Sequence, residues 1–176
     1  MTAQHVVLVG LMGTGKTTVG KRVARELGRE FHDSDTDIES REGQSVREIF
    51  EARGESEFRE LESALLERLL VSDIPLVLST GGGVVLAERN RRLLKGSHHV
   101  VWLRATIDTL VSRLRVTKGA GRRPLLDGDL RERLETLSRD RSDLYQDVAT
   151  STIDVDGLDS ERVCDLVVAC VRGDHQ

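Results

Sequence analysis

The chain has 176 residues, a length that suits one domain with one sizeable core. Hydrophobic residues make up 38% of it and charged residues 32%, and the formal net charge of −4 argues against a general nucleic-acid binder. No apolar run approaches the ~20 residues of a membrane-spanning helix, and the N-terminus lacks the pattern of a signal peptide. We therefore expect a cytoplasmic monomer without nucleic-acid or membrane partners, in which Cys164 and Cys170 stay reduced.

Short apolar runs alternate with helical patterns along the whole chain. The predicted strands are His5–Val9, Glu30–Asp33, Pro75–Thr80, His98–Leu103 and Thr150–Val155. The predicted helices are Lys16–Leu27, Glu39–Val71 with interruptions near Gly43 and Gly54, Leu86–Leu94, Thr106–Arg115, Leu130–Tyr145 and Ser160–Val171. Strands that alternate with helices indicate parallel βαβ units, so we predict a three-layer α/β/α domain over residues 1–176, with a parallel five-stranded sheet.

The stretch between the first strand and the first helix, GLMGTGKT, fits the P-loop pattern G-x-x-x-x-G-K-[ST] in full. Its glycines let backbone N–H groups close around phosphate oxygens, and the helix N-terminus adds its dipole. Lys16 can reach the β- and γ-phosphates, and Thr17 can bind Mg²⁺. The predicted ATP-binding residues in this stretch are Gly13, Thr14, Gly15, Lys16, Thr17 and Thr18.

The P-loop identifies a nucleotide but no reaction. A GTPase would carry an Asn-Lys-x-Asp stretch after a strand, and none occurs here, so the sequence favours ATP. The chain is also too short for the coupled machinery of a large motor ATPase. A small-molecule kinase is the remaining reading.

Three aspartates lie close together in HDSDTD, directly after the second predicted strand. In an extended segment Asp33 and Asp35 would share one side, where one could support Mg²⁺ and the other an acceptor hydroxyl. Asp37 would begin the next helix, in a capping or dipole-stabilising role. A purely structural role for all three aspartates is the alternative.

Three later features favour a substrate site. Arg59 and Glu62 lie three residues apart on a predicted helix and can pair. Gly81–Gly83 end a strand, which suggests that a ligand meets bare backbone there. The loop Val116–Leu126 has basic residues and no apolar period, so we predict a mobile lid. Its cations are Lys118, Arg122 and Arg123.

Taken in order, these motifs resemble the shikimate kinase family, whose domain is like that of the nucleoside monophosphate kinases. The resemblance covers nearly the whole chain and rests on GLMGTGKT, DSD, FRELE, GGG, RRPLL and RSDLY. It implies Mg²⁺- and ATP-dependent phosphorylation of the 3-hydroxyl of shikimate, a step in aromatic amino acid biosynthesis.

The resemblance also implies residue roles. Lys16, Asp35 and Arg123 would be catalytic, with Asp35 facing the acceptor hydroxyl and Arg123 reaching the phosphates from the lid. Thr17 and Asp33 would support one Mg²⁺ ion. The implied shikimate-binding residues are Asp35, Phe50, Phe58, Arg59, Gly81, Gly82, Gly83 and Arg141. Two arginines suit the single carboxylate of shikimate, and a carboxylate suits its hydroxyls.

Some assignments stay open. Either Arg122 or Arg123 could meet the γ-phosphate, and the proline that follows favours Arg123. Either Arg113 or Arg115 could pack on adenine, with a slight preference for Arg113. In the C-terminal run that begins at Asp154, Ser160 stands where the family often has proline.

Two other functions compete with this reading. One is a kinase for another small polyol acid such as gluconate, and the other is a nucleotide-binding regulatory domain without catalysis. The arginines and glycines favour shikimate over gluconate. The presence of Lys16, Asp35 and a lid arginine favours catalysis over regulation.

Overall fold

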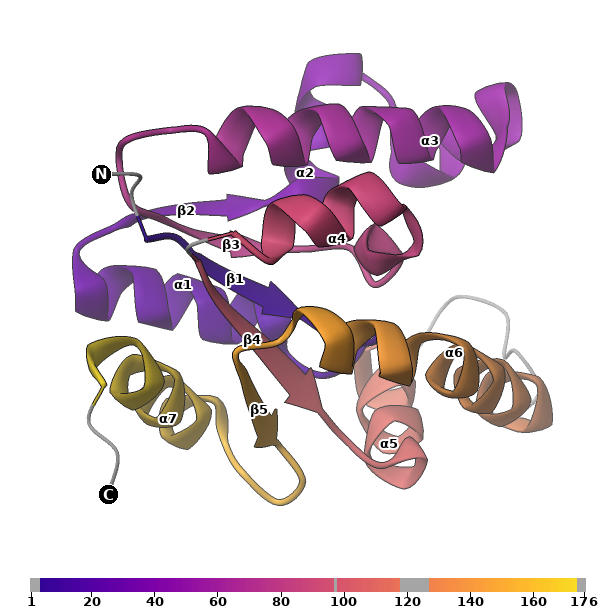
Figure 1. Ribbon diagram of the computed structural model, residues 1–176. Helices are drawn as coiled ribbons and strands as arrows, with labels where there is room; N and C mark the ends of the chain where they lie inside the picture. Colours follow the sequence, from indigo (N-terminus) through magenta and orange to yellow (C-terminus); the bar gives the residue numbers. More distant parts are fainter. Residues whose placement is uncertain (1–3, 97, 118–126, 174–176) are drawn as a thin grey trace.

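The computed structural model describes residues 4–96, 98–117 and 127–173. Its strands form one sheet in the order β2-β3-β1-β4-β5, and every neighbouring pair is parallel (Figure 1). The strands are β1 Val6–Val9, β2 Glu30–Asp33, β3 Leu76–Ser79, β4 His99–Arg104 and β5 Ser151–Asp154. The prediction of a parallel five-stranded sheet is confirmed.

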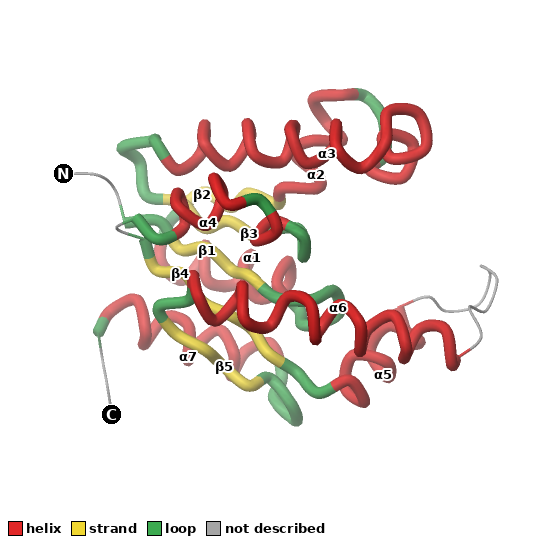
Figure 2. The backbone as a smooth tube through the Cα atoms, turned by 45° about the vertical axis from the view of Figure 1, so that its right-hand side comes forward, coloured by secondary structure: helices red, strands yellow, loops and turns green. Residues whose placement is uncertain are grey.

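Helices cover both faces of the sheet (Figure 2). Helices α1 and α7 pack on one face, whereas α3, α4 and α6 pack on the other. The helices are α1 Lys16–Leu27, α2 Ser34–Glu42, α3 Val46–Leu70, α4 Glu88–Leu94, α5 Ile107–Thr117, α6 Asp127–Val148 and α7 Ser160–Arg172, with a 3-10 turn, η1, at Val84–Leu86. This is the predicted three-layer α/β/α arrangement.

The sequence of β1 shows how one strand contributes side chains to the core on both faces of the sheet. Side chains alternate along a strand, so Val6 and Leu8 join the core under α1 and α7. Val7 and Val9 join the core on the opposite face. All four are fully buried, which explains why the run is continuously apolar. The P-loop therefore begins at the end of a strand that is buried on both sides.

The predicted interruptions of the long helical region are confirmed. Gly43 ends α2 in the left-handed conformation, with φ 66°, and Gly54 has non-helical angles inside α3. Ser45 starts α3 with a capping box, in which its hydroxyl accepts from the N–H of Glu48.

Several helix boundaries differ from the predicted ones, and α6 extends three residues beyond the predicted Leu130–Tyr145 at each end. Helix α2 begins at Ser34 rather than at Glu39, because the carboxylate of Asp33 accepts a hydrogen bond from the N–H of Thr36 and caps it. The helix predicted from Leu86 begins at Glu88, after η1.

The predicted lid lies mostly outside the described residues. Its first two residues, Val116 and Thr117, are not loop but the last residues of α5. Residues 118–126, with Lys118, Arg122 and Arg123, are not described. No described helix is both long and apolar enough to cross a membrane.

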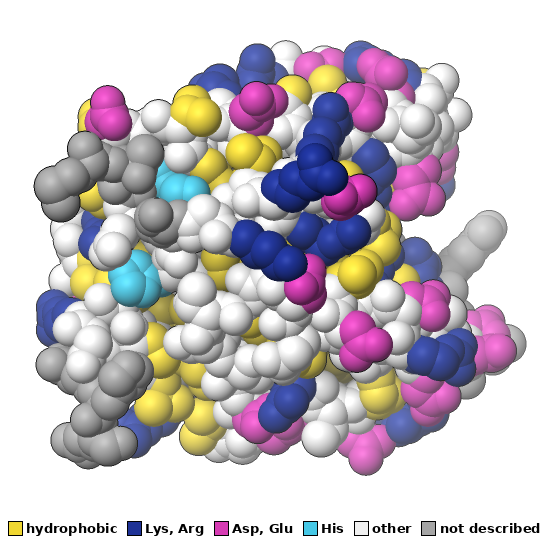
Figure 3. All heavy atoms as spheres, viewed as in Figure 1, with side chains coloured by type: hydrophobic (Ala, Val, Ile, Leu, Met, Phe, Trp, Pro, Cys, Tyr) yellow, Lys and Arg dark blue, Asp and Glu magenta, His cyan; other side chains and the backbone are white. Residues whose placement is uncertain are grey.

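Basic side chains gather over the α4 region on the face shown in Figure 3, with acidic side chains among them. Arg89 pairs with Glu60 at 2.7 Å, and Arg92 pairs with Glu88. Arg91 donates to the carbonyl oxygens of Val85 and Leu86. These cations are already engaged within the fold, so we assign no anion site to them.

Candidate active site

A cavity of about 870 Å³ lies at the carboxyl ends of the strands. In open α/β sheets this edge is where ligands collect. The P-loop, the start of α2 and the segment after β3 line one part, and α5 and the start of α7 line the rest. The lining residues used below are Gly13, Thr14, Gly15, Lys16, Thr17, Thr18, Asp33, Asp35, Ser79, Gly81, Gly82, Arg113 and Ser160.

The side chain of Lys16 is fixed at this cavity by hydrogen bonds to the backbone. Its Nζ atom donates to the carbonyl oxygens of Gly10 and Leu11, each at 2.8 Å. Only 8% of its surface is exposed, and this burial lowers the pKa of Lys16 to about 8, while the charges of Asp35 and Asp33 oppose the shift. A bound phosphate would favour the charged lysine further.

A second group of oxygens lies beside the lysine. The hydroxyl of Thr17 donates to Oδ2 of Asp33 at 2.7 Å, and it lies 3.5 Å from the hydroxyl of Ser79. Asp33 and Ser79 end two neighbouring strands, paired in register. Hydroxyl and carboxylate oxygens are the donors that Mg²⁺ prefers in proteins, so this corner suits the ion.

Asp33 and Asp35 both line the cavity, but not by the predicted geometry. They do not lie on one extended segment, because Asp33 is the cap and Asp35 is in the first turn of α2. The predicted capping role of Asp37 is also wrong. Its carboxylate instead binds Nδ1 of His32 at 2.7 Å, while its place in the first turn does suit the helix dipole.

The carboxyl of Asp35 is electrostatically unusual. Burial raises its pKa, and the neighbouring charge of Asp33 raises it further, whereas Lys16 and Arg59 act in the opposite direction. A half-buried carboxylate with a raised pKa is a stronger proton acceptor than an exposed one. Perturbed carboxyls of this kind concentrate at functional sites.

The three glycines after β3 are close to charged side chains at every position. A Cβ atom placed on Gly81 would lie 2.8 Å from Oε1 of Glu62 and 3.0 Å from Oδ1 of Asp35. One placed on Gly83 would lie 2.3 Å from Nη1 of Arg59, and one on Gly82 would lie 3.4 Å from Nη1 of Arg141. The turn therefore brings Asp35, Arg59 and Arg141 together around bare backbone.

The predicted pair of Arg59 and Glu62 is confirmed. Nη1 of Arg59 lies 2.8 Å from Oε2 of Glu62, and Glu55 approaches the same guanidinium at 3.2 Å. Glu62 is 1% exposed, and burial raises its pKa more than Arg59 lowers it. Oε1 of Glu62 has no hydrogen-bond partner in the described parts of the chain. A ligand hydroxyl or a water would satisfy it.

The two predicted phenylalanines lie beneath the same guanidinium. The rings of Phe50 and Phe58 contact each other with centroids 4.8 Å apart. The Cζ atom of Arg59 lies 5.9 Å from the centroid of Phe50 and 5.3 Å from that of Phe58. Phe58 is buried in the core, whereas Phe50 is half-buried, so Phe50 has the more accessible ring.

At the other end of the cavity, Arg113 bridges two loops. It donates to the P-loop carbonyl of Thr14 at 3.3 Å and to the carbonyls of Val155 and Leu158 before α7. Arg113 lines the cavity and Arg115 does not, which agrees with the preference for Arg113. Ser160 also lines it, while Asp154 binds Arg104 in two contacts of 2.6 and 2.9 Å.

Sequence reasoning missed several polar groups of this site. Ser34 and Tyr145 bind the glycine turn, and Ser79 faces Thr17. Of these three residues, only Tyr145 could have been predicted from the sequence, because it lies four residues after Arg141 and so shares its helix face. The predicted residue Arg123 lies outside the described part of the chain.

Comparisons with known proteins point to one family. A family model described as Shikimate kinase matches residues 12–172. A shikimate kinase of Chromobacterium violaceum is 45% identical over 153 residues, which cover 86% of this chain and 81% of that relative.

Solved structures agree. The shikimate kinase from Acinetobacter baumannii in complex with shikimate has a TM-score of 0.87 and 35% identity, and the match covers 98% of this chain and 95% of that one. A gluconokinase from Sinorhizobium meliloti has a TM-score of 0.65 at 20% identity, covering 98% of this chain and 93% of that one, which shows a shared fold alone.

Proposed function

The chain belongs to the shikimate kinase family and is an ATP-dependent kinase, and we propose that it transfers the γ-phosphate of ATP to the 3-hydroxyl of shikimate. The products are shikimate 3-phosphate and ADP. The reaction serves aromatic amino acid biosynthesis in the cytoplasm, with Mg²⁺ as the cofactor. The protein is proposed to act as a monomer.

One observation carries the choice of acceptor. Two guanidinium groups, of Arg59 and Arg141, approach the same glycine turn that the carboxylate of Asp35 approaches, beside the P-loop. Shikimate carries one carboxylate and three hydroxyls on a small ring. Arginine forks match a carboxylate, and a carboxylate or an unpartnered Glu62 oxygen matches a hydroxyl.

The oxygens near Lys16 fit Mg²⁺. Thr17 and Asp33 would hold the ion, with the substrate phosphates completing its coordination. No group of three or more metal-binding side chains was found among the described residues, which suits an ion that enters with ATP. When bound, the ion would neutralise charge on the β- and γ-phosphates.

The protein's own residues would then position and polarise the reactants. The residues Gly13–Thr18, in and directly after the P-loop, bind the phosphates, and Arg113 packs beside the adenine. Lys16 shifts from the carbonyls of Gly10 and Leu11 to the β- and γ-phosphates. Asp35 accepts a hydrogen bond from the acceptor hydroxyl and takes its proton as the bond to phosphorus forms.

The choice between acceptors is tested by comparing shikimate with gluconate. We expect ADP formation that saturates with shikimate and a kcat/KM for gluconate at least about 100-fold lower, because a site built to hydrogen-bond one substrate can reject an analogue that leaves its polar groups unpaired by about 10⁴- to 10⁵-fold. A kcat/KM for gluconate equal to that for shikimate would contradict the proposal. No ADP formation with either acid would favour a regulatory domain instead.

A further prediction distinguishes the site for the shikimate carboxylate from the site for the ATP phosphates. Arg59→Lys should raise the KM for shikimate by about 10- to 100-fold, since a lost charge-assisted hydrogen bond costs roughly 1.5–3 kcal/mol. Lysine keeps the charge but cannot bind Glu62 and a carboxylate with one planar fork. The KM for ATP serves as the internal control and should stay unchanged. An equal rise in both KM values would place Arg59 outside the acceptor site.

A further inference from the structure

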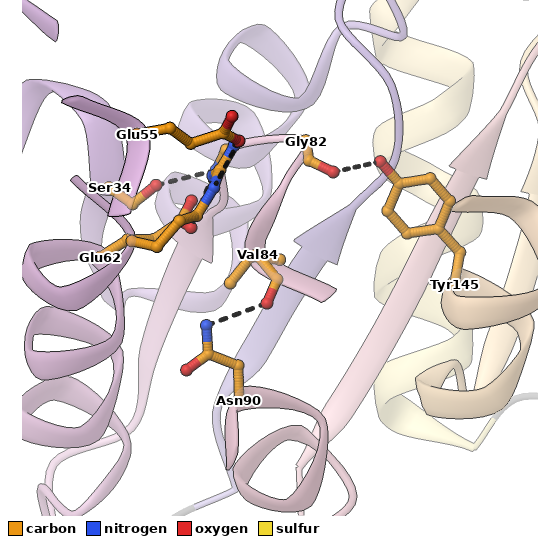
Figure 4. A network of polar contacts seen from close by, with 9 residues as sticks. Ser34, Glu55, Glu62, Gly82, Val84, Asn90 and Tyr145 are labelled. Atoms are coloured by element: carbon orange, nitrogen blue, oxygen red, sulfur yellow. Dashed lines mark hydrogen bonds and ion pairs between the residues drawn. The ribbon is translucent and has the colours of Figure 1, made fainter. Parts of the chain in front are cut away.

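The glycine turn Gly81–Gly83 is held from two sides by side chains to which the proposed reaction gives no role (Figure 4). The hydroxyl oxygen of Ser34 accepts a 2.8 Å hydrogen bond from the N–H of Gly81. The hydroxyl of Tyr145 donates to the carbonyl oxygen of Gly82 at 2.5 Å. The turn is thus fixed between α2 and α6. We call Ser34 and Tyr145 the turn clamp.

Both members of the turn clamp are themselves well fixed. Tyr145 is 1% exposed, and its ring packs on Trp102 with centroids 5.6 Å apart. Ser34 is 4% exposed and is the first residue of α2. Burial raises the pKa of Tyr145 to about 12, so the hydroxyl remains a donor near neutral pH. If either side chain moved away, the Gly81 N–H or the Gly82 carbonyl would lose its hydrogen-bond partner.

The clamp also connects the turn to residues assigned to the acceptor. Tyr145 lies one helical turn after Arg141 on α6, and the Arg141 guanidinium is a second polar neighbour of its hydroxyl. Ser34 immediately precedes Asp35 on α2. A change in either clamp contact would therefore alter the distance between the turn and a charged group of the site.

The turn also lies against the charged groups of the acceptor site. Gly81 and Gly82 line the cavity, whereas Gly83 is buried beside the guanidinium of Arg59. A Cβ atom on Gly81 would meet the carboxylates of Glu62 and Asp35, so these side chains lie directly against the turn. A shift of the turn would therefore change the spacing of these charged groups.

From these contacts we propose that the turn clamp positions the acceptor substrate. It holds the turn and the neighbouring charged groups at the spacing that the acceptor's oxygens require. Ser34 and Tyr145 act through the turn, so they are positioning residues rather than catalytic ones. The inference rests on the proposed function, because the acceptor is taken to be shikimate.

The test uses Tyr145→Phe and Ser34→Ala, each of which removes one hydroxyl. Tyr145→Phe keeps the ring that packs on Trp102. We expect each variant to raise the KM for shikimate about tenfold, the effect of losing one hydrogen bond to a buried group, with the KM for ATP unchanged. Steady-state kinetics with each substrate varied in turn give both values.

Thr150→Val is the matched control. The hydroxyl of Thr150 donates to the carbonyl of Val100 at 3.0 Å, a bond of the same kind as that of Tyr145. Thr150 lies directly before β5, at the amino end of the strand, whereas the cavity lies at the carboxyl ends of the strands. We expect neither KM to change in this variant, and its Tm gives the cost of losing such a bond where no ligand binds.

If both clamp variants have the same KM for shikimate as Thr150→Val, the inference is overturned. Ser34 and Tyr145 would then have a purely structural role. If Tyr145→Phe fails to fold, Ser34→Ala decides alone by the same criterion. The wild-type enzyme is assayed first, because a wild type that forms no shikimate phosphate would refute the proposed function itself.

Discussion

Replacing Asp35 by asparagine should lower kcat by about 10²- to 10⁴-fold, the usual contribution of a general base. Asparagine keeps the shape of the side chain but cannot take the proton of the acceptor hydroxyl. The P-loop contacts do not involve this carboxylate, so the KM for ATP should hardly change. Retention of more than about a tenth of the wild-type kcat would show that base catalysis does not come from Asp35.

The pH profile gives an independent readout of the same role. A base must be ionised, so kcat/KM for shikimate should fall as the pH is lowered through the pKa of Asp35 in the free enzyme. Because burial and Asp33 raise that pKa, the fall should lie above the usual range for an aspartate. In Asp35→Asn this acidic limb should disappear. An unchanged limb would assign it to another group.

Thermal stability provides the control for misfolding. A carboxyl whose pKa is raised by folding costs stability where it is ionised, above both pKa values, and costs nothing below the unfolded pKa. At pH 7 Asp35 is on the costly side, so Asp35→Asn should have a Tm equal to or above that of the wild type. Lost kcat with a kept or raised Tm would assign the defect to chemistry.

The second large effect is expected at Arg123. Arg123→Ala should lower kcat toward about 10³-fold, the lower end of arginine-finger effects, while the KM for shikimate changes little. The reason is the charge that develops on the transferred phosphoryl group. Arg123 lies outside the described residues. The described chain before it ends at Thr117, and the neighbouring Val116 lines the cavity.

Arg122→Ala is the matched control for this prediction, because it removes the same charge one residue away. We expect a much smaller loss of kcat, since the proline after Arg123 favours Arg123 as the phosphate ligand. A large loss in Arg122→Ala alone would exchange the two assignments. Unchanged kcat in both variants would contradict the predicted role of the lid.

The fold was predictable because its signals are local. Continuous apolar strands such as Val6–Val9 and a complete P-loop pattern need no knowledge of long-range contacts. The start of α2 was missed because SDTD has no apolar period, and its helix depends on the cap by Asp33. That error also gave Asp35 the wrong backbone conformation, although Asp35 does line the cavity.

The acceptor site was predictable only in part. The pairing of Arg59 with Glu62 follows from helical spacing. The run of three glycines indicates that other groups approach the backbone closely. The roles of Ser34 and Tyr145 depend on contacts across 47 and 63 residues of sequence, respectively. No local pattern encodes such contacts, so these hydroxyls had to be found in the structure.

The central claim is phosphoryl transfer to one specific hydroxyl. The most direct measurement incubates the wild-type protein with ATP, Mg²⁺ and shikimate, and identifies the product by phosphorus and carbon NMR alongside ADP quantification. We predict shikimate 3-phosphate in equal amount to ADP, and no product when the metal is chelated. ADP without phosphorylated shikimate, or phosphate on another hydroxyl, would contradict the assignment of the acceptor site.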